Sequence, residues 1–232
     1  MIGAHTLAHG VMLAPMAGVA DTSFRAICRA HGAEYTVSEM ISAKALCFEQ
    51  RSRAGAPAKT AELANIIEAE SPMAIQLFGR ESDYMAEAAR LVESGEYRGA
   101  SRERLPAAID INMGCPVPKV VSNGEGSALM REPALAAQIV RAIKRAVKLP
   151  VTVKIRAGFT NDNKNAPEMA KMLEDAGADL ICVHGRTRQQ FYQPSSDNGI
   201  IAAVKRAVSV PVIGNGDLNC AADVKRMIEE TE

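Results

Sequence analysis

Short apolar segments recur along the chain, and a stretch with helical spacing follows each of them. The segments begin about 33 residues apart on average, which is close to the length of one βα unit. Several are apolar on both faces, as are the strands of a parallel sheet that helices cover. We therefore expect seven strands, at residues 11–14, 35–37, 74–77, 108–111, 151–155, 180–183 and 211–213.

Helix start and stop signals lie between these segments. Asp21 and Asn165 are residue types that favour the N-terminal cap of a helix, and Pro133 suits a first helical turn. Glycine often follows the last helical residue because it adopts the left-handed backbone conformation without strain. We expect helices from Asp21 to Gly32, from Ser82 to Gly95, from Pro133 onward, from Asn165 to Gly177, and over residues 221–230.

The repeated βα order predicts an α/β fold of the TIM (β/α)₈-barrel type. A doubly wound sheet is the alternative, but no GxGxxG motif follows the first strand. After Asp217 the chain has room for one helix and for no eighth strand, so only seven βα units are present. An open barrel would leave two strand edges unpaired, and we therefore favour one barrel domain, residues 1–232, truncated at its C-terminus.

Composition narrows the function classes. The 232 residues include 27 Lys and Arg and 27 Asp and Glu, and this zero net charge gives no support for strong nucleic-acid binding, although local patches stay possible. Five cysteines without a CxxC pair indicate no disulfide framework and no metal site, and the expected compartment is a reducing cytoplasm. The apolar runs are too short for a membrane span, and the N-terminus shows no secretory signal.

Polar residues gather where the predicted strands end. In a (β/α)₈ barrel the carboxyl ends of the strands meet on one face, and the active site lies there. The candidate residues, in chain order, are Pro15, Met16 and Ala17, then Gln76, Asn112, Cys115, Lys154, Arg156, His184 and Arg186, and finally Asn215, Gly216 and Asp217.

Four of these positions have a functional and a structural interpretation. Lys154 lies in an apolar strand, where it either contacts a flavin or phosphate or forms an ion pair with an acid such as Asp110. Residues 214–217 either bind a phosphate or ribityl group or form a plain turn. Cys115 is either an acid or nucleophile or a small buried side chain. His184 is either a cofactor or substrate contact or a satisfied polar group.

Seven segments between residues 13 and 217 together resemble the bacterial type of the tRNA-dihydrouridine synthase family. They read LAPMAGVAD at 13–21, VSEM at 37–40, QLFG at 76–79, IDINMGCP at 109–116, VKIRAG at 153–158, VHGRT at 183–187 and GNGD at 214–217. The INMGCP and VHGRT segments are highly specific in this combination and order. The resemblance implies a chain truncated after the seventh strand, without the family's eighth strand and C-terminal helical domain.

The resemblance further implies an FMN-dependent oxidoreductase that uses NADPH to reduce specific uridines of tRNA to 5,6-dihydrouridine. The implied flavin contacts are Pro15, Met16 and Ala17 beside the ring, Gln76 at its edge, Lys154 at its N1/O2 side, His184, and Asn215, Gly216 and Asp217 at the ribityl-phosphate end.

On the substrate side, the resemblance implies a flipped uridine that receives a hydride at C6 from flavin N5 and a proton at C5 from Cys115. A thiol with a pKa near 8 is mostly protonated at neutral pH and can give this proton. Asn112, Arg156 and Arg186 would contact the uracil or its phosphate. The implied partner is tRNA, with no membrane and no metal, and the full-length protein is expected to be a monomer.

Two alternatives stay open. One is a flavin barrel that reduces a small molecule such as a pyrimidine or an enone, for which the missing tail leaves room. The other is a non-catalytic RNA-binding derivative of the barrel, which would bind tRNA without FMN. The presence of Cys115, Lys154 and His184 together argues against the second alternative.

Overall fold

The structure is a computed structural model that describes residues 2–3, 5–52, 59–97, 104–191 and 193–232. The chain divides into two compact units. The first unit comprises Met1–Ile111 with Ala142–Val151, and the second comprises Asn112–Arg141 with Thr152–Glu232.

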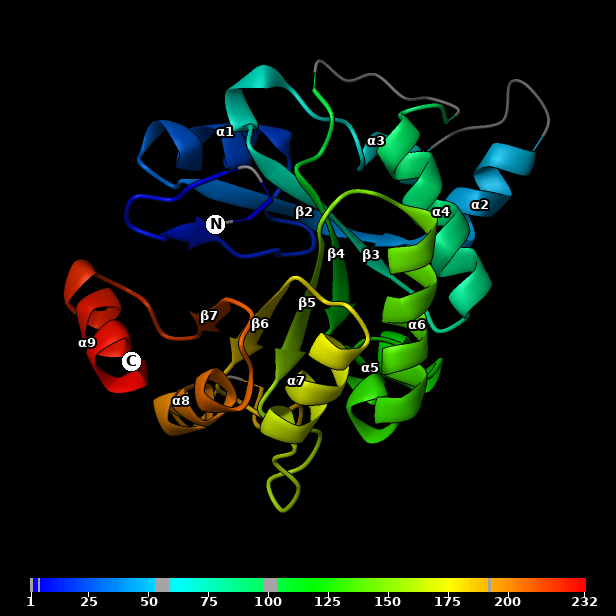
Figure 1. Ribbon diagram of the computed structural model, residues 1–232. Coiled ribbons are helices and arrows are strands. Elements are labelled where there is room, and N and C mark those ends of the chain that lie inside the picture. The colour runs from blue at the N-terminus through cyan, green and yellow to red at the C-terminus, as the bar shows by residue number, and fades with distance from the viewer. Residues whose placement is uncertain (1, 4, 53–58, 98–103, 192) are drawn as a thin grey trace. The chain divides into compact units, whose positions relative to one another are not determined.

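The first unit is built on parallel strands (Figure 1). They are β1 (Met12–Leu13), β2 (Tyr35–Ser42), β3 (Met73–Phe78) and β4 (Ala108–Met113), whose last two residues belong to the second unit. The strands lie in chain order, with Met12 opposite Tyr35 and Ala74 opposite Ala108. The accompanying helices are α1 (Thr22–Ala30), α2 (Ala43–Arg51), α3 (Lys59–Glu62), η1 (Glu68–Glu70) and α4 (Ser82–Ser94).

Local signals and burial explain these elements. The Asp21 carboxylate accepts the Phe24 N–H at 2.8 Å and so caps α1, and Gly95 ends α4 with a φ of 73°. The core of this unit consists of fully buried apolar side chains from the strands and from the inner faces of α2 and α4. They include Tyr35, Ile41, Leu46, Met73, Ile75, Leu77, Met85 and Ile109.

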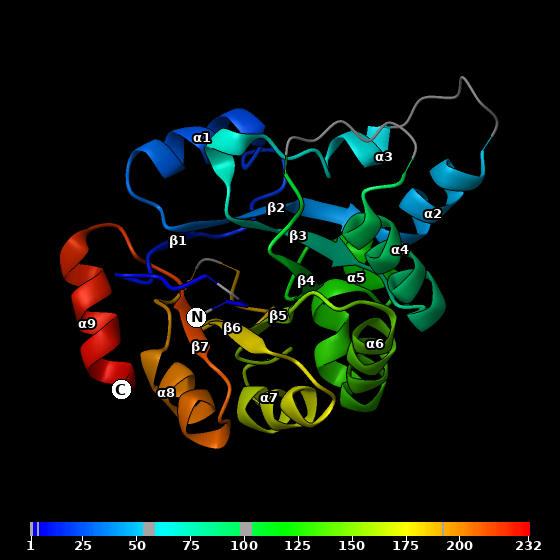
Figure 2. The ribbon, with the colours of Figure 1, turned by 45° about the horizontal axis from the view of Figure 1, so that its top comes forward.

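The second unit contains the parallel strands β5 (Val151–Arg156, from Thr152 onward), β6 (Leu180–His184) and β7 (Val212–Asn215). Its helices are α5 (Pro118–Ser122), η2 (Gly126–Arg131), α6 (Pro133–Ala146, up to Arg141), α7 (Ala166–Asp175), α8 (Asn198–Ala207) and α9 (Ala221–Thr231). Figures 1 and 2 show α7 and α8 side by side along these strands, with α9 next to α8. Buried residues between them include Val153, Ile155, Leu173, Ile181, Val183 and Ile201.

The predicted βα order and the incomplete barrel fold class are confirmed. A strand is present at each of the seven expected places, and helices begin after Asp21, at Ser82, at Pro133 and after Asn165. Within each unit the strands are parallel and sequential, as in a (β/α)₈ barrel. Among the described residues, none of the helices is long and apolar enough to cross a membrane.

One strand is longer than predicted. Strand β2 continues to Ser42, whereas the sequence indicated an end near Val37. The pairing with β3 is irregular between Val37 and Met40, and the buried Ser38 hydroxyl there accepts the N–H of Gln76 at 2.9 Å. The Ser38 side chain thus supplies a hydrogen bond at a β-bulge. Because this polar residue interrupts the apolar pattern, hydrophobic patterning does not predict that the strand continues beyond it.

Candidate active site

The predicted site residues fall in both units. Pro15, Met16, Ala17 and Gln76 belong to the first unit, and all the others belong to the second. In the first unit, the Met16 carbonyl oxygen accepts the N–H groups of Val19 and Ala20, so residues after β1 turn sharply and leave the Met16 side chain exposed. The Gln76 amide is 1% exposed, and its Nε2 donates to Asp110 Oδ2 at 2.7 Å, which orients the amide.

In the second unit, the loop that carries Cys115 is held from two sides. Asn112 Oδ1 accepts the N–H of Gly114 at 3.2 Å and of Cys115 at 2.9 Å. The Cys115 carbonyl oxygen accepts the N–H of Ser127 at 3.1 Å. Gly126 lies at a φ of 59°, and a Cβ there would meet Cys115 Cβ at 3.0 Å. The loop therefore has little freedom, and glycine is needed at position 126.

The chemistry of the Cys115 thiol follows from its surroundings. Burial raises the pKa of the thiol above its usual value, while the N–H of Val117 and the positive charge of Arg156 lower it in part. Because the pKa is raised, the sulfur keeps its proton at neutral pH. The group is therefore suited to giving a proton, rather than to acting as a thiolate nucleophile.

Arg156 connects two loops of the second unit. Its Nε donates to the Gly114 carbonyl oxygen at 2.7 Å, and its Nη1 donates to the Thr187 carbonyl oxygen at 3.1 Å. The residue is 8% exposed. It therefore braces the Cys115 loop against the loop after β6, and its predicted contact with substrate stays a prediction.

His184, at the end of β6, is a neutral imidazole. Burial, together with the charges of Lys154, Arg156 and Arg186, lowers its pKa to about 3. Its Nδ1 accepts the N–H of Arg186 at 3.1 Å, so in the neutral ring the proton lies on Nε2. His184 consequently offers one N–H donor that does not change with pH near neutrality.

Lys154 lies beside Asn215 of β7, and its Nζ donates to Asn215 Oδ1 at 2.7 Å. In the strand register Lys154 is level with Cys182 and Ile213, so Asn215 lies two residues further along β7 on the same face, within reach of the long lysine side chain. Three predicted flavin contacts, Lys154, His184 and Asn215, thus come together across β5, β6 and β7. The sequence pattern predicted that these residues lie near the carboxyl ends of their strands, but it did not predict the hydrogen bonds between them.

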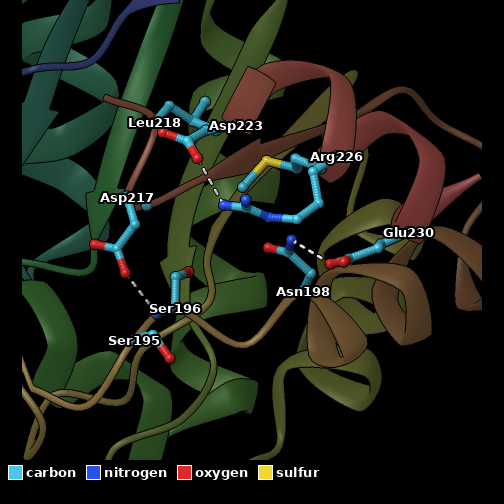
Figure 3. A pocket seen from close by; sticks show the side chains of 10 residues that line it. Ser195, Ser196, Asn198, Asp217, Leu218, Asp223, Arg226 and Glu230 are labelled. Carbon is cyan, nitrogen blue, oxygen red and sulfur yellow. Dashed lines mark hydrogen bonds and ion pairs between the residues drawn. The ribbon is translucent and has the colours of Figure 1, made fainter. Parts of the chain in front are cut away.

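A pocket of about 290 Å³ opens beside the loop that follows β7 (Figure 3). Gly216 and Asp217 line one side of it, and Arg226 and Glu230 of α9 line another. Arg226 is paired with Asp223 at 2.7 Å, and Glu230 accepts a hydrogen bond from Asn198 at 2.7 Å. Sequence reasoning did not single out these α8 and α9 residues, because isolated polar residues on helices give no signal of a pocket.

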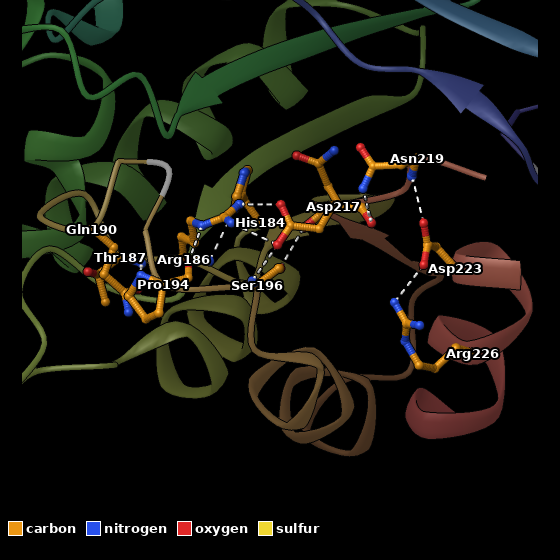
Figure 4. A network of polar contacts seen from close by, with 11 residues as sticks. His184, Arg186, Thr187, Gln190, Pro194, Ser196, Asp217, Asn219, Asp223 and Arg226 are labelled. Carbon is orange, nitrogen blue, oxygen red and sulfur yellow. Dashed lines mark hydrogen bonds and ion pairs between the residues drawn. The ribbon is translucent and has the colours of Figure 1, made fainter.

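Arg186 and Asp217 bind each other (Figure 4). Two parallel hydrogen bonds of 2.7 Å join the guanidinium and the carboxylate, and Arg186 Nε also donates to the Pro194 carbonyl oxygen at 2.6 Å. The Asp217 carboxylate accepts the Ser196 N–H at 2.8 Å, and the Arg186 charge lowers the pKa of Asp217. The resemblance assigned Asp217 to the cofactor and Arg186 to the substrate. Those contacts stay predictions, and the structure adds that the two side chains hold the loops after β6 and β7 together.

Comparison with known proteins bears on both fold and family. A family model described as dihydrouridine synthase matches residues 12–232, nearly the whole chain. This chain belongs to the dihydrouridine synthase family. It is 42% identical over 232 residues to tRNA-dihydrouridine synthase B of Pseudomonas aeruginosa, covering 99% of this chain and 64% of that protein. It is 44% identical over 222 residues to a probable tRNA-dihydrouridine synthase of Rhodobacter capsulatus, covering 95% of this chain and 64% of the relative.

This member of the dihydrouridine synthase family therefore spans slightly less than two thirds of the length of those relatives. Among solved structures, a FabK mutant from Thermotoga maritima is similar with a TM-score of 0.52 and 14% identity, over 96% of this chain and 58% of that one. That likeness concerns the fold alone. The family assignment confirms the resemblance carried by the INMGCP and VHGRT segments, both of which lie within the matched residues.

Proposed function

We propose that this chain is the catalytic part of a tRNA-dihydrouridine synthase, an oxidoreductase that reduces specific uridines of tRNA to 5,6-dihydrouridine with FMN and NADPH. The family match over residues 12–232 supports this reaction class. The observation that carries the proposal is the Cys115 thiol, protonated at neutral pH and held on a loop with little freedom. On the same proposal, tRNA is the partner, the cytoplasm is the compartment, and the full-length protein is a monomer.

The residues of the second unit fit a flavin. FMN, when bound, supplies the hydride for C6 of uracil and accepts electrons from NADPH. Lys154 provides a positive charge suited to the N1/O2 side of a reduced ring, and His184 provides a neutral N–H donor. Gly216 has a φ of 128°, and a Cβ there would lie 2.4 Å from Ser196 Oγ, so only glycine fits this turn.

Asp217 fits the cofactor only indirectly. Its carboxylate carries the same sign of charge as a phosphate and is already bound by Arg186. We therefore assign to Asp217 the shaping of the loop at Asn215 and Gly216. In the first unit we assign Pro15, Met16 and Ala17 to the flavin ring, and Gln76, whose amide is oriented by Asp110, to the ring edge.

On the substrate side, Cys115 Sγ–H gives its proton to C5 of the uracil. The protonated thiol is the required form, and the hydrogen bonds to Asn112 Oδ1 and from the Ser127 N–H restrain the backbone at Cys115. Asn112, Arg156 and Arg186 are assigned to positioning the base or its phosphate. A uridine must leave its base stack to reach such a group, so contacts elsewhere on the tRNA have to hold it.

Two measurements test the proposal together. The purified chain is incubated with FMN and desalted, and its visible spectrum is recorded. It is then incubated with NADPH and unmodified tRNA, and the nucleosides are analysed by mass spectrometry. We expect a retained flavin band and a uridine that gains two hydrogens. A chain that retains no flavin and forms no dihydrouridine would contradict the proposal, and reduction of free pyrimidines in place of tRNA would favour a small-molecule reductase.

A further inference from the structure

Two arginines share one aromatic ring in the second unit. The Arg131 guanidinium carbon lies 4.3 Å from the centroid of the Phe159 ring, and that of Arg188 lies 5.4 Å from the same centroid. Arg131 ends η2, Phe159 follows β5, and Arg188 follows β6. Three loops that come after successive strands therefore meet at one ring.

Hydrogen bonds fix these loops to one another. The Arg188 N–H donates to the Gly158 carbonyl oxygen at 2.9 Å, and the Gln189 N–H donates to that of Phe159 at 3.3 Å. Asn165 Nδ2 donates to the Met130 carbonyl oxygen at 2.9 Å, next to Arg131. The loop backbones that carry the three side chains are thus held together before any ligand arrives, and the cation–π contacts orient the two guanidinium groups, which lowers the entropic cost of binding.

The two positive charges are not neutralised within the described part of the chain. Neither Arg131 nor Arg188 forms an ion pair there, whereas Arg186 is bound to Asp217 and Arg25 to Glu70. The Nε atom of Arg188 is buried and has no hydrogen-bond partner among the described residues. A cation–π contact orients a guanidinium but leaves its charge and its N–H donors available. Two such groups at one ring form a donor set for an anion.

The chemistry of the pair selects the ligand class. A guanidinium presents a planar fork of N–H donors that matches the oxygens of a phosphate ester. The same loops hold the proposed catalytic machinery, since η2 begins at Gly126 against Cys115, and Thr187 before Arg188 accepts a bond from Arg156. A phosphate bound by this pair is therefore held by the same loops that position Cys115.

We propose that Arg131 and Arg188, oriented by Phe159, bind a backbone phosphate of the tRNA substrate close to the uridine that is reduced. The inference rests on the proposed function and adds the residues that hold the RNA. The zero net charge of the chain does not oppose this inference, because two neighbouring arginines without an ion pair among the described residues suffice for one phosphate contact.

The test uses the FMN-loaded full chain and an unmodified tRNA transcript. The variants are Arg131→Gln, Arg188→Gln, the double variant and Phe159→Leu. The exposed Arg206 of α8, changed to Gln, is the matched control for loss of one surface arginine. Binding is measured by fluorescence anisotropy at several salt concentrations. Arg188→Lys keeps the positive charge but lacks the planar fork of guanidinium N–H donors. It replaces Arg188→Gln if circular dichroism shows that the Gln variant does not fold.

We expect each Gln variant to weaken tRNA binding several-fold, and the double variant to weaken it by about tenfold or more. The slope of log affinity against log salt should fall by about one for each lost phosphate contact. Arg188→Lys should bind between wild type and Arg188→Gln, and Arg206→Gln should bind like wild type. Phe159→Leu should also weaken binding, because the guanidinium groups lose their common support.

The outcomes separate this inference from the proposed function. Unchanged tRNA affinity in the double variant overturns the inference, even if the wild type forms dihydrouridine. An altered KM for NADPH with unchanged tRNA affinity also overturns it, because the phosphate would then belong to the nicotinamide cofactor. Weakened tRNA binding in a protein that never forms dihydrouridine overturns the proposed function and leaves the RNA-binding pair standing.

Discussion

Removing the charge of Asp217 should destabilise the second unit by an amount that depends on pH. In Asp217→Asn the side chain keeps its size and one carbonyl oxygen, so the Ser196 N–H still has an acceptor. The Arg186 guanidinium, however, then faces an amide in which one of the two oxygens has become an N–H donor. The substitution therefore isolates the charge and one of the two parallel hydrogen bonds.

The size of the expected loss in unfolding free energy follows from how exposed the Arg186 and Asp217 side chains are. The Arg186 side chain is 7% exposed and that of Asp217 is 37% exposed. Breaking a fully buried pair costs about 3–5 kcal/mol, and an exposed pair contributes about 0–1 kcal/mol. Because solvent screens the Asp217 side, we expect Asp217→Asn to lower the free energy of unfolding by about 1–3 kcal/mol at pH 7. Arg186 keeps its bond to the Pro194 carbonyl oxygen in the variant, which limits the loss.

The assay is urea unfolding of wild type, Asp217→Asn, Arg186→Met and the double variant. We expect a coupling energy of about 1–2 kcal/mol between the two positions at pH 7. The pKa of Asp217 is lowered from its usual 3.8 by Arg186, so the stabilisation is fully present above about pH 4. It is lost as the pH falls through the lower pKa of the folded state. A coupling energy near zero at pH 7, or one that does not shrink in acid, would refute the reasoning.

Three further predictions concern the proposed chemistry. Cys115→Ala should retain FMN yet form no dihydrouridine by nucleoside mass spectrometry, and normal product formation would remove its role as the acid. Lys154→Ala should release flavin on desalting or slow its reduction by NADPH, because the positive charge beside Asn215 is lost; wild-type behaviour in both assays would exclude this role. The pKa of His184 is lowered to about 3, so the unfolded state binds a proton that the folded state does not, and stability falls as pH drops below about 6.5. His184→Gln should flatten this dependence between pH 4 and 7 by about 1 kcal/mol per pH unit, and an unchanged slope in urea unfolding would contradict the predicted shift.

The sequence by itself determined the order of elements and the family. Residues 108–111 are buried on both faces of their strand, and residues 180–183 are buried except for the half-buried Cys182, so the apolar side chains that dominate both segments mark them as strands. Capping residues such as Asp21 and Gly95 act within a few positions of the chain, so their signals are local as well. The INMGCP and VHGRT segments indicated the dihydrouridine synthase family, because this combination of residues in this order is highly specific.

Only the tertiary structure decided which polar side chains bind one another. Arg186 and Asp217 are 31 positions apart, and they meet because β6 and β7 are neighbours whose following loops lie together. Arg131 and Arg188 lie against the Phe159 ring for the same reason, because all three residues belong to loops that follow different, neighbouring strands. Hydrophobic patterning records which face of a strand is buried, but a long-range hydrogen bond depends on distances between segments that no local pattern encodes.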